Sequence, residues 1–245
     1  MKKRQYGDHA ALETALAKRT TTSGRLLGTL SYWRKRAMWS AAVSFARALK
    51  RLLDLYVSLF CLVFLSPLLG LVALLIKLED PAGPVFYTQD RVGQWGRVFR
   101  FPKFRSMVSN ADQIKDTILA DNQHGESITF KMKKDPRVTR TGRVIRRLSI
   151  DELPQIWCVL RGDMSLVGPR PALPREVALY TYADRRRLDA KPGLTCIWQV
   201  SGRGDIPFDQ QVKLDEQYIN SKSFWFDVKL LFKTIPAVLT GKGAY

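Results

Sequence analysis

The stretch Ser149–Pro171 reads SIDELPQIWCVLRGDMSLVGPRP and carries two adjacent carboxylates, Asp151 and Glu152, near its start. The apolar residues that follow them have the i, i+3, i+4 spacing of one helical face, which predicts a short helix. Gly162 predicts the end of that helix, since glycine is the residue most often found just beyond a helix C-terminus. The stretch then closes on a proline-rich turn.

The start of this helix can be placed in two ways. Ser149 and Glu152 have the spacing of a capping box, with serine as the N-cap and glutamate as the third helical residue. Pro154 lies too far inside such a helix. The alternative is a helix that begins at Pro154, since proline is favoured at the first helical position. On either placement the two carboxylates lie at a helix start, where the helix dipole favours their ionised form.

Arginines flank the two carboxylates on both sides. Arg146 and Arg147 come directly before them, and Arg170 lies in the turn Gly168–Pro171. A carboxylate nucleophile or metal ligand beside guanidinium groups is what phosphoryl chemistry requires. Two ordinary explanations stay open, because acidic residues at a helix start are usually only caps and a run of arginines is usually a solvated helix face.

The composition favours anionic partners. The chain of 245 residues holds 40 Lys and Arg against 22 Asp and Glu, a formal net charge of +18. Nucleic acid, anionic lipid head groups and phosphorylated substrates all fit such a charge. The three cysteines, Cys61, Cys158 and Cys196, are far apart and form no CxxC pair, so they indicate neither a disulfide framework nor a zinc site. The absence of a disulfide pattern favours a protein that faces the reducing cytosol.

Residues 1–49 form a basic N-terminal extension. Its segment Leu30–Leu49 mixes aromatic side chains with cations, which is typical of a helix lying along an anionic membrane surface. A disordered basic tail explains the same composition equally well.

The run Leu55–Ile76 contains twenty-two residues without a charge. A straight helix of that length covers about 33 Å, enough for a bilayer core of roughly 30 Å, so hydropathy alone favours a spanning helix. Pro67, after Ser66, predicts a kink in the middle of the run. Cations that precede the run place its N-terminal side in the cytoplasm, so a full span would export the rest of the chain. A helix that bends and returns to the same face avoids this conflict.

The remaining pattern predicts few strands and several helices. Short strands at Val85–Tyr87 and Val98–Phe101 surround a Gly93–Gly96 turn, which predicts a hairpin. Helices are predicted in four further segments, the last of them interrupted at Pro236: Asn110–Asn122, Pro171–Tyr182, Phe208–Ile219 and Phe226–Leu239.

Several motifs occur in the order and spacing of one known family: Ser66-Pro67 within an apolar run, KFRSM at 103–107, DPRVTRTG at 135–142, LSIDELPQ at 148–155 and GDMSLVGPRP at 162–171. Over Lys50–Tyr245 the chain resembles the bacterial sugar transferases, the monotopic polyprenyl-phosphate phosphoglycosyl transferases that initiate exopolysaccharide assembly. Two positions depart from the family pattern. Cys158 replaces a usual asparagine and Cys196 a usual glycine.

The resemblance implies an α+β fold that is mostly helical with a short β-hairpin. It implies a re-entrant membrane helix over residues 50–78, broken at Ser66-Pro67. A cytosolic catalytic domain with interfacial amphipathic helices would follow over residues 79–245. The localisation implied is the bacterial inner (cytoplasmic) membrane, with the catalytic domain facing the cytoplasm.

The resemblance also implies a reaction. Asp151 would attack the β-phosphate of a UDP-sugar and release UMP, and undecaprenyl phosphate would then take the sugar phosphate. Glu152, with Asp151, would hold Mg²⁺, while Arg146, Arg170 and Lys103 would bind phosphates. The further substrate-binding candidates are Arg147, Gln89, Arg91 and Arg203. The C-terminal GKGAY is similar to that of hexose-specific members, which points to galactose or glucose.

The partners expected are therefore a UDP-sugar, undecaprenyl phosphate and inner-membrane lipid, with no nucleic acid; a homodimer is compatible with the sequence. Two alternatives remain. The basic balance also suits a membrane-anchored nucleic-acid-binding protein, although the cations are dispersed among motifs rather than gathered in one stripe. A non-catalytic membrane scaffold would keep the same fold.

Overall fold

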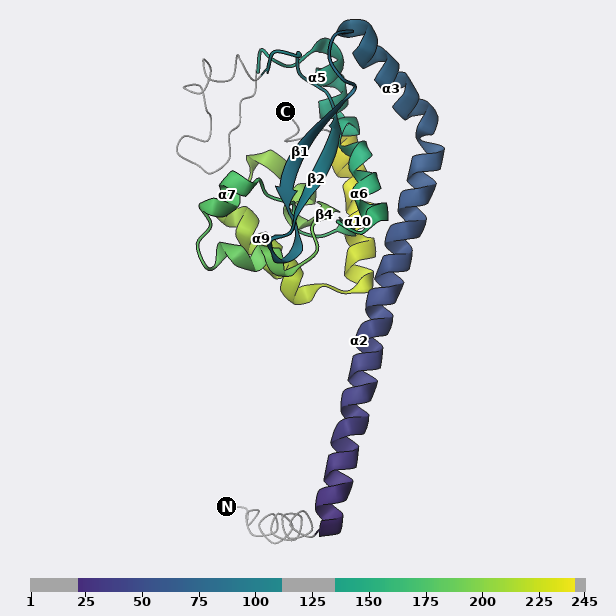
Figure 1. The fold of residues 1–245 in the computed structure, drawn as a ribbon, viewed down its shortest axis with the longest axis vertical. Coiled ribbons are helices and arrows are strands. Elements are labelled where there is room, and N and C mark those ends of the chain that lie inside the picture. Colours follow the sequence, from purple (N-terminus) through teal and green to yellow (C-terminus); the bar gives the residue numbers. More distant parts are fainter. Residues whose placement is uncertain (1–21, 112–134, 241–245) are drawn as a thin grey trace, which may run out of the picture. The chain divides into compact units, whose positions relative to one another are not determined.

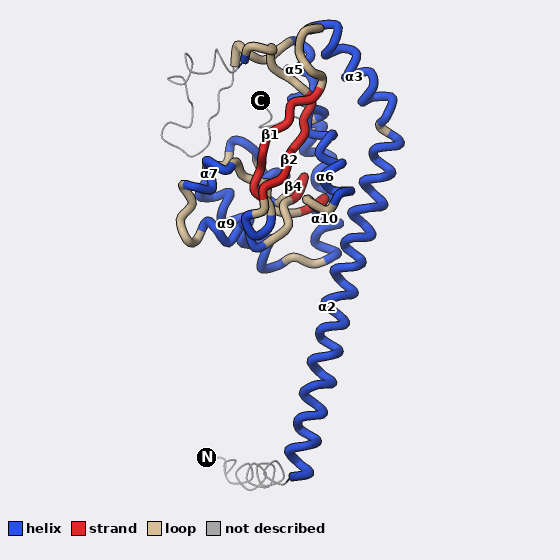
Figure 2. Tube along the Cα trace, viewed as in Figure 1, coloured by secondary structure: helices blue, strands red, loops and turns tan. Residues whose placement is uncertain are grey.

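The computed structural model describes residues 22–111 and 135–240, which are mostly helical with two small sheets (Figures 1 and 2). The chain divides into two compact units, Met1–Leu49 and Lys50–Tyr245. The second unit contains the stretch 149–171 and is the one considered below. The helix predicted over Asn110–Asn122 lies almost entirely outside the described residues.

The predicted break at Ser66-Pro67 is confirmed as a bend. Helix α2 (Thr22–Phe64) ends just before it, α3 (Ser66–Glu79) begins at it, and the two axes differ by 58°. Proline is tolerated in the first turn of α3, where its missing N–H would have no helical partner. The Ser66 hydroxyl donates to the carbonyl of Val63 at 2.8 Å. Among the described residues, no single helix is long and apolar enough to cross a membrane, and only this bent pair meets the length and composition test.

Polar side chains fasten α2 to the core of the second unit. Arg51 donates to two carbonyls of α6 (Ile156–Arg161), at 2.6 and 2.7 Å. Asp54 is buried and accepts from a hydroxyl and a backbone N–H of strand β3 (Ser165–Val167), at 3.1 and 3.0 Å. Lys50 donates to the last carbonyl of β3 at 3.2 Å and forms an ion pair with buried Asp227. The start of the apolar run is therefore tied to β3.

The far end of the helix pair is fastened to the same unit. Glu79 caps α5 (Arg140–Arg147), since its carboxylate accepts the backbone N–H groups of the first two helical residues at 2.7 and 2.9 Å. Asp80 accepts from Arg105 at 2.9 Å. Val72 on α3 is buried in a small apolar cluster with residues of β2 and α5. The part of α2 that begins at Lys50 and the end of α3 thus both contact the second unit.

The predicted hairpin is confirmed and is longer than expected. Strands β1 (Phe86–Val92) and β2 (Val98–Phe104) pair antiparallel across the turn η1 (Gln94–Gly96). A second sheet, formed by β3 and β4 (Gly193–Thr195) in parallel, was not predicted. Strands of three residues are too short to leave a periodic signal in the sequence.

The stretch that carries the two carboxylates begins differently from the capping-box prediction. A 3₁₀ helix, η3 (Ile150–Gln155), precedes α6. Ser149 has a left-handed backbone (φ 54°), and its side chain does not cap η3, so the capping box is wrong. Pro154 has no N–H for an α-helical bond, which suits the tighter turn. The carboxylates still lie in the first turn of a helix, and Gly162 ends α6 with φ 90°, as predicted.

The C-terminal third is helical with short connections. Its elements are α7 (Pro174–Ala178), η4 (Asp184–Asp189), α8 (Ile197–Ser201), η5 (Arg203–Asp205), α9 (Phe208–Ser221) and α10 (Phe224–Thr240). The helix predicted at 208–219 is confirmed. The helix predicted at 171–182 shrinks to α7, because Pro171 and Pro174 disfavour helix in the residues before them.

Helix α10 continues through Pro236, so the predicted interruption is wrong. Helix α10 packs against α8, β3 and β4, and this tertiary packing favours a continuous helix despite the proline. The main core lies beneath these elements and consists of Phe99, Phe101, Cys158, Val159, Met164, Leu166, Val167, Cys196, Trp198, Tyr218 and Leu230.

Candidate active site

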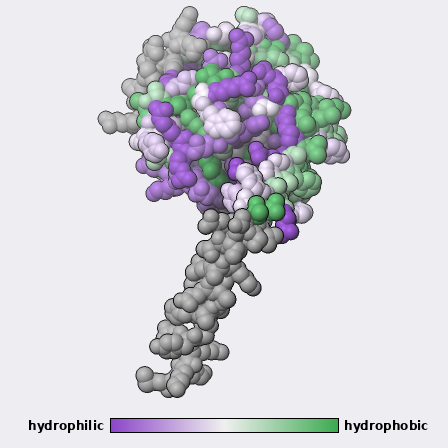
Figure 3. Space-filling model, turned by 60° about the horizontal axis from the view of Figure 1, so that its bottom comes forward, coloured by the Kyte–Doolittle hydropathy of each residue, from purple (hydrophilic) through white to green (hydrophobic). Residues whose placement is uncertain are grey.

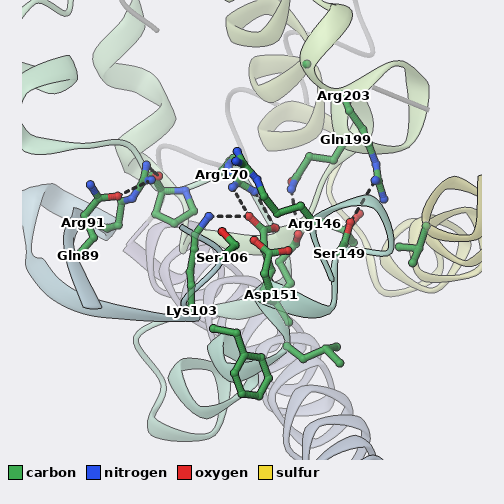
Figure 4. A pocket seen from close by; sticks show the side chains of 18 of the residues that line it. Gln89, Arg91, Lys103, Ser106, Arg146, Ser149, Asp151, Arg170, Gln199 and Arg203 are labelled. Carbon is green, nitrogen blue, oxygen red and sulfur yellow. Dashed lines mark hydrogen bonds and ion pairs between the residues drawn. The ribbon is translucent and has the colours of Figure 1, made fainter. Parts of the chain in front are cut away.

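One cavity of about 1500 Å³ in the second unit collects most of the predicted site residues. They come from β1 and β2, from α5 and η3, from the turn after β3, and from η5. Figure 4 shows Lys103, Arg146 and Arg170 gathered around Asp151. The predicted residues that line the cavity are Gln89, Arg91, Lys103, Arg146, Asp151, Glu152, Arg170 and Arg203.

Arg147 is the exception among the predicted phosphate-binding residues. Its side chain is exposed, and it is not among the described residues that line the cavity. Successive residues of a helix point about 100° apart, so when Arg146 of α5 faces the cavity its neighbour faces away. The structure therefore assigns Arg147 to the solvated face of α5.

Glu152 is held by two cations. Lys103 Nζ lies 2.9 Å from Glu152 Oε1, and Arg170 donates both to Oε1 and, at 3.1 Å, to Oε2. Burial alone would raise the pKa of Glu152, but the charges of Arg170 and Lys103 and the hydrogen bonds they donate hold that pKa well below its usual range. Glu152 is therefore ionised at neutral pH.

Asp151 is buried beside Glu152 and meets a different balance of charge. Burial and the negative charge of Glu152 raise the pKa of Asp151 to about 6. Lys103, Arg146 and Arg170 oppose that rise. A carboxylate destabilised in this way, with cations close by, is suited to chemistry rather than to a structural ion pair.

The cations around this pair are fixed by the fold. Strand β2 packs against η3, which brings Lys103 to the carboxylates. Lys103 also lies over the ring of Phe101, with Nζ 5.5 Å from the ring centre. Burial lowers the pKa of Lys103, and the charge of Glu152 opposes that change. Arg170 follows β3 by three residues, so the position of that strand decides where the guanidinium lies.

Gln89 and Arg91 lie on the other side of Lys103 (Figure 4). Arg91 donates to Gln89 Oε1 at 2.9 Å and to the carbonyl of Pro171 at 3.0 Å. Burial, and then the charge of Arg170, lower the pKa of Arg91 to about 10. Arg91 therefore supports the backbone next to Arg170 besides adding positive charge to the cavity.

A third group of polar residues lies at the opposite side of the cavity. Arg203 Nη1 donates to Ser149 Oγ at 3.1 Å. Gln199 also lines the cavity; its Nε2 donates to the carbonyl of Leu194 at 3.0 Å, while its buried Oε1 has no hydrogen-bond partner in the described part of the chain. Gln199 was not predicted as a site residue, although it lies only four residues before Arg203 in the sequence.

Comparisons with known proteins show the family of this chain. A family model described as bacterial sugar transferase matches residues 45–241. The chain belongs to the bacterial sugar transferase family. It is 47% identical over 198 residues to the galactosyl transferase CpsE of Streptococcus agalactiae serotype III (strain NEM316), covering 80% of this chain and 43% of that protein.

Two further relatives of this bacterial sugar transferase differ in length. The undecaprenyl-phosphate galactose phosphotransferase of Salmonella typhimurium is 43% identical over 203 residues, 82% of this chain and 42% of its own length. The exopolysaccharide production protein ExoY of Sinorhizobium fredii is 41% identical over 199 residues, 80% of this chain and 88% of its own length. The chain thus spans less than half the length of the first two relatives.

The two cysteines that depart from the family pattern lie beneath the site rather than in it. Cys158 and Cys196 are buried members of the main core, and neither is among the described residues that line the cavity. Cys158 Sγ contacts the carbonyl of Arg100 at 3.5 Å. These two departures therefore alter core packing and leave the polar lining of this bacterial sugar transferase intact.

The two carboxylates Asp151 and Glu152 are the candidate ligands for a metal ion. In residues 22–111 and 135–240 no group of three or more His, Cys, Asp or Glu side chains could hold one. Asp151 and Glu152 are adjacent in the cavity, and Mg²⁺ is commonly bound by one or two carboxylates together with substrate phosphates and water. The two carboxylates therefore fit a Mg²⁺ whose other ligands come from the substrate.

Proposed function

We propose that this bacterial sugar transferase moves a hexose 1-phosphate from a UDP-sugar to undecaprenyl phosphate, the first membrane step of exopolysaccharide synthesis. The observation that carries the proposal is the difference in environment between two neighbouring carboxylates in one cationic cavity. Glu152 is engaged by Lys103 and Arg170, whereas Asp151 carries a raised pKa. The names of the relatives, which include undecaprenyl-phosphate galactose phosphotransferase, support the same reaction.

In the first step a carboxylate oxygen of Asp151 attacks the β-phosphorus of the UDP-sugar. A bond forms between this oxygen and phosphorus, the bond from phosphorus to the bridging oxygen breaks, and UMP leaves with that oxygen. The product is a phospho-aspartate that carries the sugar, which divides one difficult transfer into two easier ones.

In the second step a phosphate oxygen of undecaprenyl phosphate attacks the same phosphorus. The bond to Asp151 breaks, the carboxylate is regenerated, and the lipid leaves as its diphospho-sugar. Lys103, Arg146 and Arg170 stabilise the negative charge that gathers on the phosphoryl oxygens. Mg²⁺, held by Asp151 and Glu152 with the diphosphate, would neutralise further charge on that group.

The sugar we propose is galactose or glucose. Two of the relatives are named for galactose, and the chain matches them over four fifths of its length. Another relative, from Aeromonas hydrophila, is named for N-acetylgalactosamine, so the reaction class is supported more broadly than the sugar.

We further propose that the bent pair α2–α3 enters the cytoplasmic face of the inner membrane and returns to it. Each leg beyond Lys50 is about 20 Å long, short of the roughly 30 Å of a bilayer core. The pair exposes many apolar side chains: Leu52, Tyr56, Leu59, Phe60, Val63, Phe64, Leu71, Leu74, Leu75 and Leu78. In Figure 3 hydrophobic residues gather along the side on which α3 lies in Figure 1, while the face turned to the viewer is largely hydrophilic.

The function is tested by UMP release from a panel of UDP-sugars. Membranes containing the protein are supplied with undecaprenyl phosphate and Mg²⁺, and wild type is compared with Asp151→Asn. Release with one sugar in wild type, and its loss in the variant, is the expected result. No release with any sugar from folded protein would reject the proposed reaction.

A further inference from the structure

The cavity that holds Asp151 also has an apolar half. On α2 its wall is formed by Leu53, Val57 and Cys61, which follow each other at intervals of four and so share one helical face; Leu65, directly after the helix, also lines it. On α10 the wall is formed by Val228, Leu231, Ile235 and Val238, spaced three and four apart. The two helices therefore present apolar stripes to one continuous cavity.

Leu153 and Ile156 are apolar lining residues that stand next to the carboxylates in the chain. They follow Glu152 by one and four residues along η3 and α6. The lining of this one cavity thus combines cations with aliphatic side chains. A ligand that fits both halves has an anionic head and a long hydrocarbon chain.

We propose that the groove between α2 and α10 holds the hydrocarbon chain of the polyprenyl phosphate acceptor, with its phosphate among Lys103, Arg146 and Arg170. This inference rests on the proposed function and adds to it the binding site of the acceptor chain. Charge complementarity argues for this occupant, because the head-group side of the cavity is cationic and the groove is lined by aliphatic residues. Burial of hydrocarbon against such walls contributes to affinity in proportion to the area removed from water.

The opposite explanation is that these apolar residues only contact membrane lipid. Helix α10 argues against it, since Lys229 and Lys233 are exposed on the helix while Ile235 faces the cavity. Val228, Leu231, Ile235 and Val238 thus line the groove, whereas the two lysines and the exposed Trp225 of the same helix do not. The two explanations predict different effects for residues that are equally exposed but differ in whether they line the cavity.

Matched substitutions separate them. Phe232→Ser and Ile235→Ser remove apolar groups that line the cavity at 69% and 56% exposure, so neither change should unfold the protein. Trp225→Ser on the same helix and Leu59→Ser on α2, at 76% and 58% exposure, remove apolar groups that are absent from the described lining. These two serve as controls for loss of membrane contact.

The assay uses the full-length enzyme in detergent micelles with two readouts. Exchange of labelled UMP into the UDP-sugar without acceptor reports the first step alone. Complete turnover is measured against undecaprenyl phosphate and against a polyprenyl phosphate of three isoprene units. The groove variants should raise KM for undecaprenyl phosphate at least about fivefold, leave exchange unchanged, and show a smaller effect with the short acceptor.

An unchanged KM in the groove variants would overturn the inference. An equal rise in the two controls would do the same, since it would assign the effect to membrane contact. Absence of exchange in wild type would reject the phospho-aspartate mechanism, whereas intact exchange with an unchanged KM in the groove variants would reject the groove alone, so the two failures are distinguishable.

Discussion

The residues Asp151 and Glu152 are chemically similar neighbours, yet the fold gives them different partners. Glu152 binds Lys103 and Arg170 with both oxygens, which keeps it charged and oriented. Asp151 is raised in pKa by burial and by Glu152. In the proposed reaction Glu152 positions the cations and the metal, while Asp151 reacts. An ionised, poorly stabilised carboxylate is the better nucleophile of the two.

The pH dependence of the first step should report Asp151. Its pKa in the folded chain, about 6, lies above the ordinary 3.8, so the reactive carboxylate forms only as pH rises through about 6. We expect kcat/KM for the UDP-sugar to show an acidic limb there, because that parameter reports groups of the free enzyme and the diphosphate diester has no group titrating in this range.

Lys103→Met should move this limb to higher pH, because Lys103 is one of the cations that lower the pKa of Asp151. Arg161→Met is the matched control, since Arg161 is exposed and pairs with Asp163 outside the dyad. A limb near pH 4 in wild type, or one that Lys103→Met leaves in place, would contradict this account.

Removal of the metal should stop turnover without unfolding the protein. Mg²⁺ is expected to bind with the diphosphate, because in the described part of the chain no group of three or more His, Cys, Asp or Glu side chains could hold it alone. EDTA should therefore abolish UMP release and leave the thermal unfolding midpoint within about 1 °C of its original value. A large loss of stability in EDTA without substrate would indicate a metal that is part of the folded protein.

At the scale of elements, β3 links α2 to the candidate active site. Its residues donate two hydrogen bonds to Asp54 of α2 and accept one from Lys50, and Arg170 follows three residues later. Gly168 lies between them, where an added Cβ would be 2.3 Å from the carbonyl of Lys191. The segment that carries Arg170 is therefore held on two sides.

Asp54→Ala should lower the free energy of unfolding by about 2–4 kcal/mol, since it leaves two buried donors of β3 without an acceptor. It should also reduce kcat more than it raises KM for the UDP-sugar, because Arg170 is displaced. Asp54→Asn keeps the accepting oxygen and should recover most of both losses. Chemical denaturation in detergent and steady-state kinetics check the pair; equal damage from Asn and Ala would argue against this role.

Long-range pairing explains which elements the sequence could and could not predict. The bend at Ser66-Pro67, the hairpin and the end of α6 at Gly162 depend on local chemistry, and they were predicted. Strands β3 and β4 are stabilised by pairing between residues about thirty apart, so no local pattern indicates them. Within the site, the motifs predicted most cavity residues, but the direction of Arg147 depended on how α5 packs.

At the scale of the molecule, the two fastened ends of the bent pair bear on topology. A helix that crossed the bilayer would separate its ends by the membrane thickness, yet the ends near Arg51 and Glu79 contact one compact unit. Hydropathy alone favoured a spanning helix, because it counts apolar residues and does not include the contacts that the ends of the helices make.

Cysteine labelling tests the proposed topology. Ser40→Cys lies in α2 before the apolar run Leu55–Ile76, and Ala82→Cys lies just after α3, so the two place exposed thiols on either side of that run, in a background with Cys61→Ala. We expect a membrane-impermeant maleimide to label both in inverted inner-membrane vesicles and neither in intact spheroplasts. The background without added cysteines gives the control, and labelling of one site from outside would show a spanning helix.

In the proposed re-entrant arrangement, the fastening of both ends also affects how the enzyme should respond to bilayer thickness. A spanning helix must match the thickness of the hydrocarbon layer, and mismatch costs fractions of a kcal/mol per ångström. A helix pair that enters and leaves by one face of the membrane contacts only the nearer leaflet, so it does not have to match the full thickness of the hydrocarbon layer. Turnover should therefore hold steady between bilayers of short and long acyl chains, so one enzyme could serve membranes whose thickness changes with growth temperature.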